Sequence, residues 1–170
     1  MKANIMFQEI QKQNQKWIWF LLIIILCFVI FGFVQQVFFN KPFGTHPVPD
    51  WVFSFFFFLP LFFIGFLLRT ELRTTINEEH IGFSYRPFFK RKKVIEWKDV
   101  EKCYVRIYSP IKEYGGWGLR TAFNGKRGKA YNVSGNMGIQ LELKSGELIL
   151  IGTRKPAEAK EQIKRIQALQ

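Results

Sequence analysis

Basic side chains gather in two short segments of the C-terminal half. The first is Lys90-Arg91-Lys92-Lys93, and the second is Asn124–Lys129, NGKRGK, which contains Lys126, Arg127 and Lys129. Cations close to an anionic leaflet contribute about 1 kcal/mol each, and backbone amides of a glycine-containing turn also hold phosphate. We expect both segments to be turns and candidate contacts for lipid phosphate. The alternatives are a solvated turn or a topology determinant for the first segment and a plain hairpin tip for the second.

A third candidate is the segment Glu113–Arg120, EYGGWGLR. Its glycines permit tight or left-handed backbone. Tyr114 and Trp117 are candidate contacts for a protein partner, because large aromatic side chains anchor many interfaces. The alternative is that both rings pack the open end of a barrel, since large aromatic residues are more often buried.

Catalytic and metal-binding patterns are missing from the sequence. His80 is the only histidine after the apolar segments described below, and it follows two glutamates in a turn-like stretch. The chain contains no G-x-S-x-G, H-E-x-x-H, C-x-x-C or P-loop spacing. We therefore expect no enzymatic activity, no cofactor and no metal. The two cysteines, Cys27 and Cys103, are expected to be buried thiols in a reducing compartment.

Two apolar runs dominate the N-terminal half. Trp17–Phe39 and Trp51–Leu68 contain no charged residue. At about 1.5 Å per residue the runs would form helices roughly 34 and 27 Å long, and helices of about 17–25 residues cross a hydrocarbon core of about 30 Å. Pro60 is expected to kink the second helix. The runs predict a transmembrane hairpin.

The flanking charges predict the orientation of this hairpin. Lys12 and Lys16 precede the first run, Arg69 and Arg73 follow the second, and the loop between the runs offers only Lys41. Because cations favour the cytoplasmic side, both termini should be cytoplasmic, in the cell (inner) membrane. The expected organisation is a cytoplasmic segment 1–16, spans 17–39 and 51–68 with an external loop 40–50, and a cytoplasmic domain 69–170.

After Arg69 the hydrophobic period changes to two, as in Ile139, Leu141 and Leu143. This alternation predicts seven or eight short strands of a barrel or sandwich. Pro156 suits the first position of a closing amphipathic helix. The N-terminal segment Met1–Lys16 is expected to be a short amphipathic helix on the inner leaflet or a frayed tail.

Four stretches carry a resemblance to a known group: TTINEEHIGFSYRPF, VIEWKDV, EYGGWGLR and GELILIGTRKPAEAKEQI. In their order after a two-span hairpin they resemble the bacterial PH-like (pleckstrin-homology-like) membrane proteins, over about Arg69–Leu169. The resemblance implies a mostly antiparallel PH-like β-barrel or sandwich capped by a C-terminal α-helix. The expected fold class is thus an α+β membrane protein. Members of this group mostly lack an assigned activity, so the resemblance implies fold and anchoring more than chemistry.

The function expected from these features is a membrane-anchored binding or scaffold module. Its basic domain would contact a protein partner or the anionic lipids of the inner leaflet. The alternative is an accessory structural subunit of a larger membrane complex. The net charge of +12 also suits nucleic acid, but the inner leaflet explains it better, so no nucleic-acid partner is expected.

Overall fold

The computed structural model describes residues 5–46, 48–122 and 128–169. The chain divides into two compact units. One, called here the domain, comprises Met1–Gln13 and Thr70–Gln170, and the other, the helical hairpin, comprises Asn14–Arg69. The N-terminal segment therefore belongs to the domain that we expected in residues 69–170 alone.

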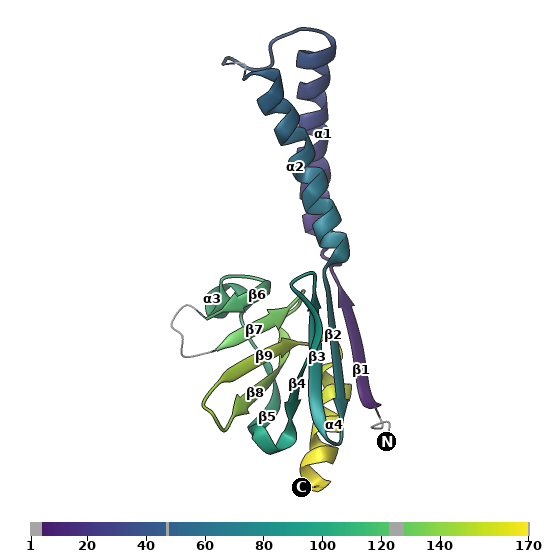
Figure 1. Cartoon of the computed structure of the whole chain (residues 1–170), viewed down its shortest axis with the longest axis vertical. Helices are drawn as coiled ribbons and strands as arrows, with labels where there is room; N and C mark the ends of the chain where they lie inside the picture. Colours follow the sequence, from purple (N-terminus) through teal and green to yellow (C-terminus); the bar gives the residue numbers. More distant parts are fainter. Residues whose placement is uncertain (1–4, 47, 123–127, 170) are drawn as a thin grey trace. The chain divides into compact units, whose positions relative to one another are not determined.

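The helical hairpin contains the two predicted apolar helices (Figure 1). α1 spans Lys16–Phe33 and continues as a π-helical turn, Val34–Phe38, while α2 spans Asp50–Arg69 with Pro60 inside it. α1 and α2 pack against each other but leave most of their large apolar side chains exposed. By length and composition both helices are able to cross a membrane.

The first strand of the domain lies before the helical hairpin in the sequence. β1, Ile5–Lys12, pairs antiparallel with β2, Glu71–Asn77. The expected amphipathic helix or frayed tail is therefore wrong. The strand is fixed because Phe7, Glu9 and Gln11 all turn inward and are buried.

Hydrogen bonds from the inward face of β1 reach the end of the last strand of the domain. The amide Nε2 of Gln11 donates to the carbonyl oxygen of Gly152 at 2.6 Å. The Glu9 carboxylate accepts from the Thr153 hydroxyl at 2.7 Å and from the backbone N–H of Arg154 at 2.8 Å. Buried polar groups that are paired in this way avoid a large desolvation cost.

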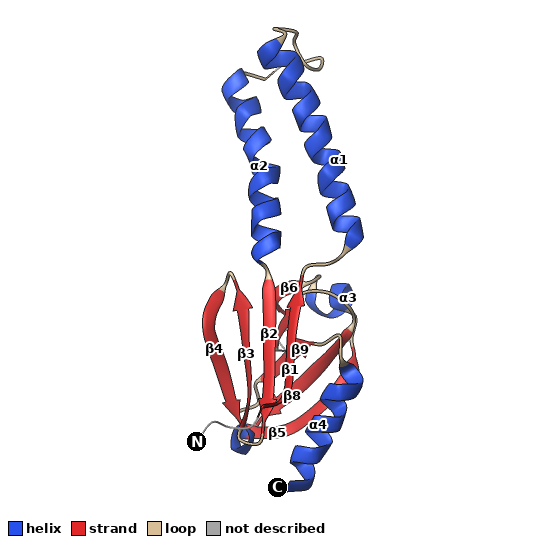
Figure 2. Ribbon diagram, turned by 90° about the vertical axis from the view of Figure 1, so that its right-hand side faces the viewer, coloured by secondary structure: helices blue, strands red, loops and turns tan. Residues whose placement is uncertain are grey.

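The first sheet is an antiparallel meander in the order β1-β2-β3-β4 (Figure 2). β3 spans His80–Arg86 and β4 spans Phe89–Glu96. The turn between them is therefore at Pro87-Phe88, and the predicted basic turn Lys90–Lys93 is instead part of edge strand β4. The prediction of a basic turn was wrong for two reasons. The turn after Arg86 contains only Pro87 and Phe88, so β4 already begins at Phe89. A run of exposed cations is also as compatible with an edge strand as with a turn.

The second sheet has the order β5-β8-β9-β7-β6. All neighbours are antiparallel except β7 and β9, which are parallel. The predicted alternation is confirmed only in part: Leu141 is fully buried and its neighbour Glu142 is not, but Gln140 is buried as well. The strands and the short helices beside them are β5 Val100–Ile107, β6 Gly118–Thr121, β7 Lys129–Asn132, β8 Met137–Leu143, β9 Leu148–Gly152, a 3-10 turn Trp97–Asp99 and α3 Pro110–Tyr114.

The closing helix α4, Pro156–Leu169, starts at the predicted proline and packs against β5, β8 and β1. Its buried face carries Ala159, Ile163 and Ile166. These side chains join the main core between the sheets, in which Phe83 and Tyr131 have ring centroids 4.7 Å apart. The two sheets and one helix thus enclose a single main core.

A smaller apolar cluster contains Tyr108, Tyr114, Ala122, Ala130 and Leu150. Leu150 alternates on β9 with Ile149 and Ile151, which belong to the main core. The small cluster therefore covers the opposite face of the second sheet, where α3 packs. Its two tyrosine rings meet edge to face at 6.0 Å.

The helical hairpin is the connection between two neighbouring strands. Lys12, the last residue of β1, is paired with Glu71, the first residue of β2. The chain therefore leaves the domain and returns to it at the same end of the same sheet. The contacts of Gln11 and Glu9 with residues 152–154 bring the second sheet to this end as well.

Candidate functional site

The cations of β4 project from both faces of an edge strand. The Lys92 side chain lies over Gly82, and its Nζ is 3.2 Å from Nε2 of His80. Burial lowers the pKa of Lys92. Lys93 points differently: its Nζ lies 4.8 Å from the ring centroid of Phe89 and donates to the Tyr131 hydroxyl at 3.3 Å. The four cations thus do not converge on one phosphate-sized site.

Their position on an edge strand is also significant for how the first sheet ends. An edge strand presents unpaired N–H and C=O groups that can pair with another chain, and lysines on such a strand oppose that pairing. Lys90 and Arg91 are exposed on β4. The cluster is therefore suited to protecting the edge of the first sheet as well as to contacting an anionic surface.

Only part of the second basic segment can be placed. Lys126 and Arg127 lie outside the described residues. Lys129 begins β7, and its Nζ pairs with the Glu147 carboxylate at 2.9 Å. This hydrogen bond raises the pKa of Lys129. Because Lys129 already has an acidic partner, it is a weaker phosphate contact than its sequence context suggested.

The two aromatic candidates have different environments. Tyr114 is buried, and its hydroxyl oxygen accepts from Nη2 of Arg106 at 3.2 Å. Trp117 is partly exposed, and its Nε1 donates to the carbonyl oxygen of Gly135 at 2.9 Å. Gly115 and Gly118 around it have φ of 72° and 117°, which explains the glycines of this segment. Trp117 therefore remains available as a surface contact, whereas Tyr114 packs the small cluster.

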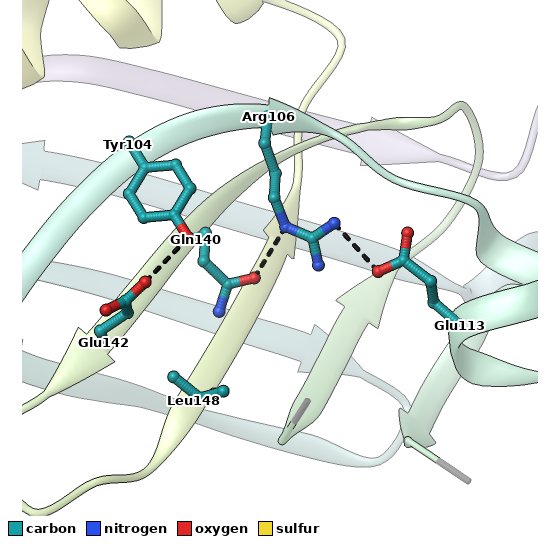
Figure 3. A pocket seen from close by; sticks show the side chains of 6 residues that line it. All are labelled: Tyr104, Arg106, Glu113, Gln140, Glu142 and Leu148. Carbon is teal, nitrogen blue, oxygen red and sulfur yellow. Dashed lines mark hydrogen bonds and ion pairs between the residues drawn. The ribbon is translucent and has the colours of Figure 1, made fainter. Parts of the chain in front are cut away.

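Sequence reasoning did not single out a polar concavity on the outer face of the second sheet (Figure 3). Its volume is about 350 Å³. The lining residues come from β5, α3, β8 and β9, and they are Tyr104, Arg106, Glu113, Gln140, Glu142 and Leu148. The sequence signal that could have revealed this concavity is the period of two in the strands. Tyr104 and Arg106 on β5 are paired with Gln140 and Gly138 on β8, and the polar side chains at these positions lie on the outer face.

Hydrogen bonds within this concavity already satisfy its charged groups. Nε of Arg106 donates to Gln140 at 3.0 Å, and Nη1 of Arg106 pairs with Glu113 at 2.9 Å. The Tyr104 hydroxyl donates to Glu142 at 2.8 Å, which raises the pKa of Tyr104. With two carboxylates and one guanidinium mutually bonded, the concavity is suited to polar contacts and offers no activated nucleophile.

Redox and metal chemistry find no support in the described residues. Within residues 5–46, 48–122 and 128–169, no three His, Cys, Asp or Glu side chains are grouped as a metal site. Burial raises the pKa of the Cys103 thiol to about 12, so this thiol stays protonated and unreactive at neutral pH. Nε2 of His80 contacts both Asn77 and Lys92.

A search of curated proteins finds no match to the chain. A family model described as a family of unknown function, DUF6141, matches residues 1–169. The matched region includes β1, the helical hairpin, both sheets and α4. The chain therefore belongs to this family of unknown function, DUF6141.

Proposed function

We propose that this protein is a membrane-anchored PH-like binding module. Its helical hairpin would hold the basic domain at the inner face of the cell membrane, where the domain contacts a protein partner or anionic lipid. The observation that carries the proposal is that an apolar two-helix hairpin connects the paired strands β1 and β2. The domain cannot fold without bringing the two ends of that hairpin together.

The composition of the helices supports insertion into a membrane. Both are long, apolar and mostly exposed, with exposed phenyl rings such as Phe20, Phe58 and Phe62. An exposed apolar surface of this kind is unfavourable in water and indicates a lipid or protein environment. Because β1 and β2 pair in one sheet, two crossings would return the chain to the side from which it left.

The strand order supports the PH-like comparison. The first four strands form an antiparallel meander, β5, β8 and β9 form a second antiparallel set, and α4 closes the chain. On this comparison α3, β6 and β7 are an insertion between β5 and β8. A binding role fits the domain better than catalysis, because its polar concavity lacks an activated group.

Topology and anchoring are tested on the full-length protein. We expect it to stay in the membrane pellet after alkaline carbonate extraction. A reporter fused after Gln170 should be active only in a cytoplasmic assay, and a cysteine placed at Thr45 should be labelled by an impermeant reagent from outside. Release by carbonate would overturn the anchoring, and labelling only from the cytoplasmic side would reverse the orientation.

The partner is tested by cross-linking in the native membrane. A binding module should be captured with a defined protein, or should bind anionic vesicles after reconstitution. Failure of both measurements with folded protein would remove the binding function while leaving the anchoring intact.

A second candidate function is an accessory subunit of a larger membrane complex. The exposed phenylalanines of both helices favour it, because aromatic faces also pack against other membrane helices. In a mild detergent this function predicts a stable assembly containing other membrane chains. A monodisperse single chain would contradict it.

A further inference from the structure

One end of the domain differs from the rest in its surface chemistry. We call it the entry rim, because the chain passes to and from the helical hairpin there, at the paired residues Lys12 and Glu71. Glu71 is also paired with Arg86, so the β3–β4 turn lies at this end. Both views place α3 and β6 at the same level of the domain as this turn (Figures 1 and 2).

Hydrogen bonds tie α3 and the start of β6 to the entry rim. Arg154 donates to the carbonyl oxygen of Lys12 and to the Ser134 hydroxyl. Next to Ser134, the Gly135 carbonyl accepts from Trp117, and the Asn136 carbonyl accepts from the backbone N–H of Tyr108. The segments before and after α3 are thus held beside the end of β1.

Large apolar side chains are exposed on the entry rim. Phe88 forms the tip of the β3–β4 turn and is 52% exposed, although its ring stacks on Tyr85 at 5.4 Å. Ile111, on α3, is 64% exposed. Trp117 is partly exposed between α3 and β6. Aromatic and aliphatic residues at protruding turns are favoured at the boundary between headgroups and acyl chains.

Cations accompany these apolar side chains. Arg86, Lys90, Lys112 and Arg120 are all exposed, and none has an acidic partner within the described part of the chain. The acidic side chains near them are engaged elsewhere, since Glu71 pairs with Arg73 and Glu113 pairs with Arg106.

The opposite end of the domain has a mixed charge, because Lys98 pairs with Glu96 and Lys129 pairs with Glu147 among its carboxylates. Glu78 and Glu79 occupy the β2–β3 turn, and Glu96 and Asp99 flank the connection from β4 to β5. Glu147 lies in the β8–β9 turn. The two ends therefore differ: the four cations of the entry rim lack acidic partners among the described residues, whereas cations and carboxylates are mixed at the far end.

We propose that the entry rim is a lipid-contact surface for anionic phospholipid headgroups, an inference that rests on the proposed membrane anchoring. Arg86, Lys90, Lys112 and Arg120 bind phosphate groups, while Phe88 and Ile111 insert at the level of the glycerol backbone. Continuity with the chain entry favours this occupant, because β1 and β2 lead into the helical hairpin from this end of the domain.

The test uses the full-length protein, reconstituted into bilayers of phosphatidylcholine with or without phosphatidylglycerol. With Cys27 replaced by alanine and the buried Cys103 unreactive, a fluorophore is attached to Ile111→Cys. A matched protein carries it at Glu78→Cys, at the opposite end of the domain. The measurement is quenching by a lipid that carries a spin label just below its headgroup.

In phosphatidylglycerol bilayers at low salt we expect quenching at position 111 and little at position 78. Four cations at about 1 kcal/mol each would favour the contact by up to roughly a thousandfold over bilayers without anionic lipid. High salt should weaken the contact between the entry rim and the anionic headgroups, because the screening length falls to about 3 Å at 1 M. When the four rim cations are replaced with glutamine, quenching at position 111 should be the same in bilayers with and without phosphatidylglycerol. A control with the same charge change, Lys98, Lys144, Lys160 and Lys164 to glutamine, should retain the difference between the two kinds of bilayer.

Equal quenching at positions 111 and 78, or none at 111 in anionic bilayers at low salt, would overturn the lipid-contact proposal. Loss of the contact in the control variant to the same extent would also overturn it, since net charge would then be the cause. A protein that does not remain in the bilayer at all would instead refute the anchoring. If the quadruple variant is unfolded, Phe88→Ser with the label at 111 provides the second test, with reduced quenching expected.

Discussion

Replacing Phe7 with alanine should destabilise the domain by about 3–5 kcal/mol, the usual cost of removing a buried phenyl ring. Phe7 is only 4% exposed, lies opposite Ile76 on β2 and belongs to the main core. The matched control is Ile10→Ala on the same strand. Ile10 is 48% exposed on the outer face, so its truncation should cost less than about 1 kcal/mol.

Unfolding of the domain can be followed in the full-length protein through Cys103. This thiol is buried in the main core and reacts only when the domain opens, so pulsed labelling across a urea series in a Cys27→Ala background measures the fraction unfolded. A loss of 3–5 kcal/mol raises the unfolding equilibrium constant by roughly two to three and a half orders of magnitude. Indistinguishable urea midpoints for the Phe7 and Ile10 variants would show that β1 does not contribute to the core.

Three further predictions concern the sheets. Leu141→Asp should unfold the domain, whereas Glu142→Lys should change the melting temperature little, because only the first places an unpaired charge in the core. Burial raises the pKa of Tyr85 to about 12. The neutral Tyr85 side chain therefore contributes about 3 kcal/mol to the free energy of unfolding below pH 10, and this contribution is lost as the pH rises to 12. Tyr85→Phe should remove this loss of stability between pH 10 and 12 in an alkaline unfolding curve. A chain in which an Asn-Gly turn joins Lys12 directly to Glu71 should fold as a soluble domain, since these residues are already paired, and an aggregated product would contradict that.

Long uniform patterns made much of this architecture predictable. The two charge-free runs specify apolar helices without reference to the rest of the chain. The alternation at Ile139, Leu141 and Leu143 specifies β8, because these three side chains all pack in or against the main core. Pro156 marks the first residue of α4 for the local reason that its missing N–H costs nothing there. These features depend on neighbours in the sequence.

The missed strand β1 depends on distant residues instead. Its inward positions include Glu9 and Gln11, polar residues that hide the alternation expected of a strand. Gly152, Thr153 and Arg154, at the far end of the chain, supply hydrogen-bond partners for the Glu9 carboxylate and for Nε2 of Gln11. No periodicity within the N-terminal segment reveals those partners.

The candidate contacts were only partly predictable for a similar reason. The basic run Lys90–Lys93 was identified, but not its place on an edge strand, because strand and turn both expose cations. The concavity around Arg106 was not identified, since its partners Gln140 and Glu113 come from separate elements. Tyr114 and Trp117 are three residues apart but differ in burial, because the left-handed Gly115 reverses the chain between them.

The pairing of Lys12 with Glu71 also fixes an order of assembly during synthesis. β1 emerges from the ribosome first, yet its partner β2 emerges only after both apolar helices. A flexible loop as long as Gln13–Thr70 would impose a closure entropy of roughly 4 kcal/mol on that pairing. On the proposed anchoring, helices that have already formed and packed in the membrane would remove most of this cost. On the proposed anchoring, membrane insertion would therefore precede the pairing of β1 with β2 and promote folding of the domain in the full-length chain.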